Sequence, residues 1–230
     1  MVYMDHVVGN HEQRAQMIDV WMAVLTQHRQ ELVSLVYDVP IVRLSVEDWP
    51  VMPRLNYFRT SRVNFLEPLA YPSSGARIRK APALQVFEAR VDEDAMIEFF
   101  RRQTGLRRVA LTGEPEDLLD ILANENGYGL LSDRSASFRT LDRVVLRTVV
   151  SDDFGDPARP DGVSAEEFFR LLVSDARYTF NERRQANGVH VLLVVQVIFM
   201  DAVDMAVGRH EPSIFDRYNP LGPSFADSEQ

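Results

Sequence analysis

The stretch LVSDARYTFNERR, residues 172–184, decides how the second half of the chain is interpreted. Apolar side chains recur along it at helical spacing, and the same face begins upstream: Phe168, Leu172, Ala176 and Phe180. Ser164 and Glu167 have the spacing of a capping box, in which two side chains satisfy free N–H groups of the first helical turn. We therefore predict a helix that begins after Ser164 and ends near Arg184.

The composition is typical of a soluble globular domain. The 230 residues are 46% hydrophobic and 26% charged, enough to bury a core. The net charge of −9 argues against broad affinity for a nucleic-acid backbone, although one local basic patch stays possible. Cysteine is absent, which excludes disulfides and thiolate chemistry, and the five histidines have no metal-ligand spacing. We therefore expect neither a metal nor a cofactor.

No segment has the pattern of a membrane anchor. The longest apolar run, residues 189–200, is interrupted by Gln196 and is too short to span a bilayer. The N-terminus lacks a basic region followed by an apolar core, so no signal peptide is visible. Localisation stays open between a secreted mature form and a cytoplasmic protein.

Hydrophobic patterning predicts one α+β domain with no apparent internal repeat. It would be strand-rich over residues 1–112 and helix-rich over 113–207, with an irregular tail over 208–230. Expected strands cover residues 36–44, 56–64, 83–89 and 107–113, and expected helices begin near residues 12, 92, 115, 138 and 164. Periodicity alone leaves residues 189–207 open between helix and strand.

Three stretches resemble segments of a known family: VYDVPIVRLS, residues 36–45, LQVFEARVDEDAMIEFFRRQTGLRRVALTGEPEDLL, residues 84–119, and LLVSDARYTFNERR, residues 171–184. The family is the ribosome-inactivating proteins, the rRNA N-glycosidases of the ricin and Shiga toxin A-chains and trichosanthin. The resemblance covers roughly residues 14–205. It implies an N-terminal mixed β-sheet and a mainly helical C-terminal half around a long buried helix.

The resemblance also implies an activity, hydrolysis of the N-glycosidic bond of one adenine in the sarcin–ricin loop. Arg177 matches the arginine that protonates or polarises the leaving adenine. The family's glutamate stands three residues earlier, where this chain has Ser174, so Asp175 is the nearest carboxylate. Glu167 and Arg170 offer a rival register, because they keep the i, i+3 spacing that puts two side chains on one helix face.

Aromatic residues that would stack on the flipped adenine are also assigned through the resemblance. Tyr71 is the candidate for the first tyrosine, with Tyr57 as an alternative. Pro115 stands near the position of the second, and Tyr128 downstream is its possible substitute. The family's tryptophan has no counterpart here, and Phe199 is the nearest aromatic replacement.

Three functions follow as hypotheses. The first is an rRNA N-glycosidase whose partner is the ribosome and its large-subunit rRNA. The second is a catalytically impaired protein of the same fold that acts as a binding scaffold. The third is an unrelated α+β structural or assembly protein. No membrane partner is expected, and a partner protein chain stays possible.

Overall fold

A computed structural model describes residues 2–4, 11–37, 50–60, 81–91, 93–123, 129–155 and 158–201. The described residues form seven strands and four helices. The strands are β1 (Val2–Met4), β2 (Ser34–Tyr37), β3 (Tyr57–Thr60), β4 (Val86–Arg90), β5 (Arg108–Thr112), β6 (Arg143–Thr148) and β7 (Val194–Phe199). The helices are α1 (His11–His28), α3 (Glu93–Arg102), α4 (Pro115–Ala123) and α5 (Ala165–Ala186).

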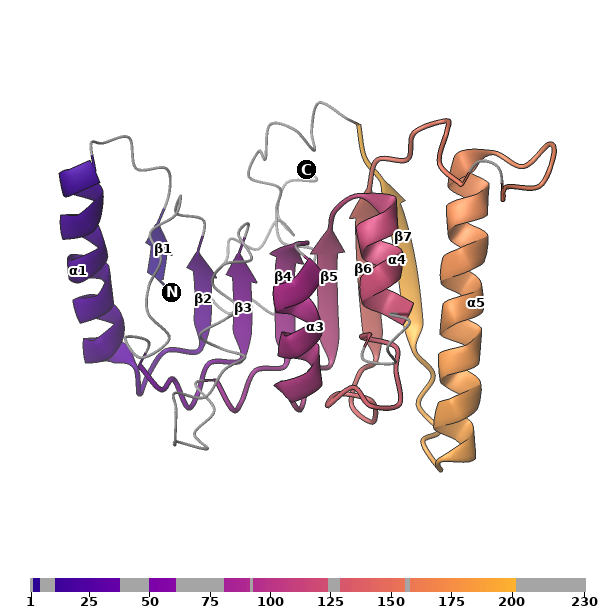
Figure 1. Ribbon diagram of the computed structural model, residues 1–230. Helices are drawn as coiled ribbons and strands as arrows, with labels where there is room; N and C mark the ends of the chain where they lie inside the picture. Colours follow the sequence, from indigo (N-terminus) through magenta and orange to yellow (C-terminus); the bar gives the residue numbers. More distant parts are fainter. Residues whose placement is uncertain are drawn as a thin grey trace, which may run out of the picture.

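All seven strands belong to one parallel sheet in the order β1-β2-β3-β4-β5-β6-β7 (Figure 1). Each strand therefore pairs with its neighbours along the chain, and every connection moves one position in the same direction. Right-handed crossovers that always step the same way place every connecting helix on the same face of a sheet. The described helices therefore lie on one face of the sheet, and we call the other the helix-free face because no helix of the described residues covers it.

Burial supports this arrangement. One large apolar cluster contains alternate residues of strands β2 to β6, among them Leu35, Phe58, Phe87, Val109 and Val144. Helical residues join the same cluster: Trp21 and Leu25 from α1, Met96, Phe99 and Phe100 from α3, Leu118, Ile121 and Leu122 from α4, and Phe169, Val173 and Phe180 from α5. The core therefore lies between the sheet and a single layer of helices.

A leucine precedes five of the strands at a constant distance. It stands three residues before a core-facing strand residue: Leu32 and Leu35, Leu55 and Phe58, Leu84 and Phe87, Leu106 and Val109, Leu141 and Val144. All five preceding leucines are buried. A leucine at this spacing before a strand residue begins the signature of leucine-rich solenoid repeats. The expectation of no internal repeat is therefore wrong.

Backbone hydrogen bonds recur with the same period. The carbonyl of Asn56, the residue after a repeat leucine, accepts N–H groups of Gln85 and Val86, both at 2.9 Å. The carbonyl of Gln85 accepts those of Arg107 and Arg108 in the same way, at 2.8 and 3.0 Å. Both the buried leucines and the backbone hydrogen bonds therefore recur from one repeat to the next.

The sheet must curve because helices need more room than strands. Packed helix axes lie about 8–10 Å apart, whereas neighbouring strands lie about 4.8 Å apart. Along β4 to β7, α3, α4 and α5 each connect two adjacent strands, and Figure 1 shows these helices spread further apart than the strands. This packing geometry predicts a sheet that curves with the helix-free face on the inside.

The expected α+β fold is wrong. The all-parallel sheet and its alternation with helices form an α/β pattern, and neither a mixed N-terminal sheet nor a mainly helical second half is present in the described residues. Strands β6 and β7 lie in the part expected to be helical, whereas α1 confirms the helix expected near residue 12. The expected long central helix is also not buried, because α5 exposes Leu171 and Tyr178 by 56% and 60%.

The clearest local error concerns residues 138–149. Phe138, Leu141, Val145 and Val149 have helical spacing, yet residues 143–148 form β6. This strand is buried on both faces, since Val144 faces the helices and Val145 lies in the cluster on the other face. A strand buried on both faces loses the polar–apolar alternation that marks a strand in sequence.

Other local expectations are confirmed. The side chain of Ser164 accepts a hydrogen bond from the N–H of Glu167 at 3.2 Å and caps α5, which ends at Ala186. Helix α4 begins at Pro115 as expected, where its missing N–H costs nothing. Strands β3 and β5 fall within the expected ranges, and β4 extends one residue beyond its range, to Arg90. The segment left open, residues 189–207, contains β7.

Candidate functional site

Helix α5 carries the three residues that the sequence analysis assigns to catalysis, and their surroundings differ from one another. Ser174 and Asp175 are exposed, and Arg177 is half-buried. Tyr178 is exposed, and a hydrogen bond to Glu182 raises the pKa of its hydroxyl. Because successive helical residues point about 100° apart, Asp175 and Arg177 face different neighbours.

One side of α5 faces β7. The Arg170 guanidinium lies 4.8 Å from the ring centre of Phe199, and the Asn181 amide bonds both backbone groups of Leu193, at 2.8 and 3.3 Å. Arg177 lies seven residues after Arg170 and four before Asn181, which puts it on the same stripe of the helix. Arg177 therefore belongs to the side of the helix that packs on the last strand.

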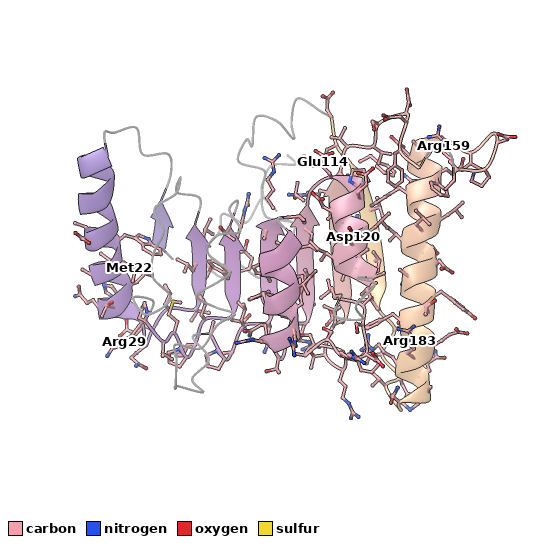
Figure 2. The ribbon with its side chains drawn as sticks, in the orientation of Figure 1. Met22, Arg29, Glu114, Asp120, Arg159 and Arg183 are labelled. Carbon is pink, nitrogen blue, oxygen red and sulfur yellow. The ribbon has the colours of Figure 1, made fainter. Side chains whose placement is uncertain are left out.

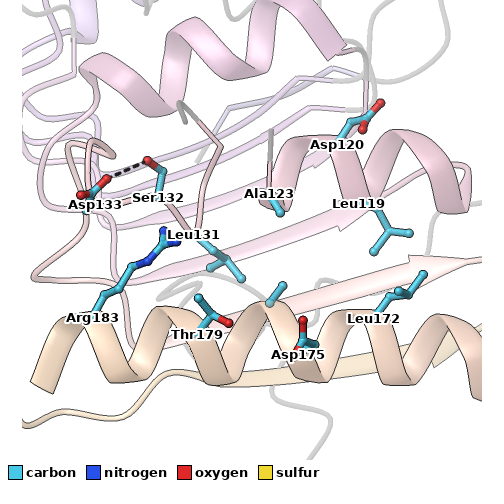
Figure 3. A pocket seen from close by; sticks show the side chains of 11 residues that line it. Leu119, Asp120, Ala123, Leu131, Ser132, Asp133, Leu172, Asp175, Thr179 and Arg183 are labelled. Carbon is cyan, nitrogen blue, oxygen red and sulfur yellow. Dashed lines mark hydrogen bonds between the residues drawn. The ribbon is translucent and has the colours of Figure 1, made fainter. Parts of the chain in front are cut away.

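The opposite side of α5 faces α4 across a hollow of about 590 Å³ (Figure 3). Asp175 lines this hollow, whereas Arg177 does not. The apolar lining comes from both helices and from the segment between α4 and β6: Leu119, Ala123, Leu131, Leu172 and Ala176. The polar lining is Asp120, Ser132, Asp133, Asp175, Thr179 and Arg183. The structure thus separates the two residues that the resemblance pairs.

The described residues proposed to stack on adenine do not cluster around α5. Tyr71 and Tyr128 lie outside the described residues. Phe199 is half-buried at the end of β7, with its ring centre 6.4 Å from that of Phe169. Tyr57 is buried on the helix-free face, where its hydroxyl bonds Glu88 at 3.1 Å. Of the candidate aromatics that the structure describes, Tyr57 and Phe199 therefore lie on opposite faces of the sheet.

A basic surface on the helix-free face was missed by sequence reasoning. Strand alternation and register place five arginines there together with Glu88: Arg59, Arg90, Arg108, Arg143 and Arg147. The guanidinium of Arg108 also forms an ion pair with Asp142, at 3.6 Å. Arg108 pairs with Arg143 in the register, and Arg90 and Arg147 flank Thr112 in another row. The arginines surround Ala110 and Val145, which form the buried apolar centre of this face. We call this set of five the arginine face.

The arginine face is most accessible beside the last two strands. Arg143 and Gln196 are exposed, and Val194, the register partner of Arg143, is 48% exposed. Leu192, two residues before Val194, is 55% exposed. An exposed guanidinium and two exposed aliphatic side chains therefore lie close together at this end of the sheet.

The buried Arg184 fastens α5 to the segment before β6. Its side chain is 1% exposed and donates to the carbonyls of Leu141 at 2.7 Å and Arg139 at 3.3 Å. Burial lowers the pKa of this guanidinium, and the charge of Asp142 partly opposes that shift. Its Nε lies beyond hydrogen-bond reach of any acceptor in the described residues, and the group stacks over Phe180 at 5.4 Å. Arg184 therefore stabilises the packing of α5 against the segment before β6.

Comparison with protein-family models, with curated proteins and with solved structures gives no match. Within the described ranges, no three His, Asp or Glu side chains gather as they would around a metal ion. No helix in that part of the chain is both long and apolar enough to cross a bilayer. The function must therefore be argued from the surfaces themselves.

The arginine face leaves a weak signal in the sequence. The strand RVVLRT has an arginine at its first and fifth positions, which share a face, and RVALT begins with one. The signal becomes visible only once these segments are known to be neighbouring strands in register. The distribution of charge along the chain hides it, because acidic residues outnumber basic ones.

Proposed function

We propose that this protein is a binding module and that its ligand is an acidic polypeptide segment held on the arginine face beside β6 and β7. The single observation that carries the proposal is the exposed Arg143 next to exposed Val194 on a helix-free sheet face. Solenoid proteins use the concave surface that curvature creates for binding. Here the corresponding surface presents a guanidinium group and an aliphatic side chain to solvent, and both can contact a ligand.

Charge indicates the partner. The chain as a whole has 34 acidic and 25 basic residues. On this face the five arginines outnumber Glu88 and Asp142, the acid that pairs with Arg108. Guanidinium groups bind carboxylates with two parallel hydrogen bonds, and Leu192 and Val194 add apolar contact that a bare polyanion would not use. An acidic segment with aliphatic side chains therefore fits better than a nucleic-acid backbone.

The N-glycosidase activity implied by the resemblance stays a prediction. Release of adenine from ribosomes, with Arg177→Ala as the comparison, is the measurement that tests it. The binding proposal does not use Arg177.

The test is fluorescence anisotropy with a labelled extended peptide made of glutamates and two leucines. Arg143→Glu replaces attraction by repulsion at the exposed centre of the surface, so we expect affinity to fall at least about tenfold, equivalent to about 1.4 kcal/mol. Leu192→Ser should weaken binding by a smaller factor. Arg183→Glu is the matched control, because it reverses an exposed arginine in the helix layer, and it should stay within about twofold.

Two outcomes would overturn the proposal. One is equal loss in Arg143→Glu and Arg183→Glu, which would mean general charge attraction. The other is tighter binding of a single-stranded RNA of matched charge, lost in Arg143→Glu, which would make the face a nucleic-acid surface.

A further inference from the structure

The hollow between α4 and α5 results from unequal helix lengths. Helix α4 has 9 residues and α5 has 22, about 14 and 33 Å at 1.5 Å per residue. The shorter helix therefore covers only part of the side that α5 turns toward it. Figure 2 places Asp120 on α4 and Arg183 toward the C-terminal end of α5.

The lining follows α5 for three turns. Leu172, Ala176, Thr179 and Arg183 recur at helical spacing and mark an elongated groove of about 17 Å. Figure 3 shows Leu119 and Leu172 facing each other across it, with Asp175 and Thr179 directed into it from α5. An elongated groove with an apolar floor is the shape that receives one face of an amphipathic helix.

The charge of the groove is opposite to that of the arginine face. Its lining carries Asp120, Asp133 and Asp175 against a single cation, Arg183. None of these four side chains forms an ion pair with another described residue. The carboxyl of Asp133 accepts one hydrogen bond, from Ser132 at 3.5 Å. The remaining negative charge lies around an apolar floor and is available to a ligand.

From the apolar floor, the helical spacing and the unpaired carboxylates, we propose that the α4–α5 groove binds a basic amphipathic helix of a partner protein. The apolar side of that helix packs on Leu119, Leu131 and Leu172, and its lysine or arginine side chains reach Asp120 and Asp175. This site lies in the helix layer, on the other side of the sheet from the arginine face, and it stands independently of the function proposed above.

The test uses calorimetry with an amphipathic Leu–Lys helical peptide of about five turns. An analogue with glutamate in place of lysine is the peptide control. Asp175→Lys reverses the central charge of the groove and should weaken binding at least about tenfold. Asp161→Lys makes the same charge change at an exposed residue of the loop before α5 and should stay within about twofold.

A second variant separates shape from charge. Thr179→Trp fills the hollow without changing its charge, so it should also weaken binding at least about tenfold. Circular dichroism of each variant shows that the fold is retained. The proposal fails if Asp175→Lys and Asp161→Lys weaken binding equally, if Thr179→Trp binds like the unaltered protein, or if the glutamate analogue binds as well as the lysine peptide.

Discussion

The two faces of the sheet are built from the same strands and have opposite properties. In β5, Val109 and Leu111 pack under the helices, whereas Arg108 and Thr112 point to the helix-free face. A parallel sheet of the common doubly wound kind has helices on both faces and an apolar residue at almost every position. Here winding in one direction places all the described helices on one face, and the other face carries arginines around a buried apolar centre. The topology thus creates the surface on which a ligand can bind.

The largest difference between the two faces should appear in stability. Phe87 is fully buried on the helix-covered face, with ring centres of Phe99 and Phe100 at 4.6 and 6.1 Å. Phe87→Ala should reduce the free energy of unfolding by about 4 kcal/mol, because it removes apolar burial and leaves a cavity. Val194→Ala on the other face should change it by about 0.5 kcal/mol or less. Urea unfolding of both variants measures the contrast, and equal losses would contradict it.

A second contrast sets two adjacent arginines of α5 against each other. Arg184 is buried and bonds two carbonyls, whereas Arg183 is exposed. Arg184→Met should reduce the free energy of unfolding by about 2 kcal/mol, because the carbonyls of Leu141 and Arg139 lose their charged donor. Arg183→Met should stay within about 0.5 kcal/mol. Similar midpoints of chemical unfolding for both variants would show that the hydrogen bonds of Arg184 do not contribute to the free energy of unfolding.

The smallest effect concerns the start of the same helix. Ser164→Ala removes the acceptor for the N–H of Glu167 and should reduce the free energy of unfolding by about 1 kcal/mol. Ser164→Asp keeps an acceptor and should restore most of the loss. Thermal unfolding followed by circular dichroism would measure both, and an unchanged midpoint in Ser164→Ala would mean that packing alone holds the helix layer.

Sequence reasoning located most individual elements but not their assembly. The cap at Ser164 and the start of α4 at Pro115 were predictable because capping chemistry involves residues within one helical turn. Strand β6 was not, because its burial on both faces removes alternation. The internal repeat was not recognised because its units differ in length. Leucines 32, 55, 84, 106 and 141 are separated by 23, 29, 22 and 35 residues, so no fixed period is visible.

The candidate sites were predictable to a smaller degree. Asp175 was singled out through a supposed pairing with Arg177, and the structure gives it another neighbourhood, the groove beside α4. The arginine face was not expected, because Arg108 and Arg143 are 35 residues apart in the chain and become neighbours only in the register.

The sequence by itself determined the local structural features of this protein: its helix caps, the apolar faces of its helices and the leucine before each of five strands. These depend on contacts within a few residues of the chain. Only the tertiary structure decided that the sheet winds in one direction and that arginines from four strands share one face. The alternation of a strand says which residues lie together on a face, but not which strand lies beside it, because that choice is made by contacts between distant segments.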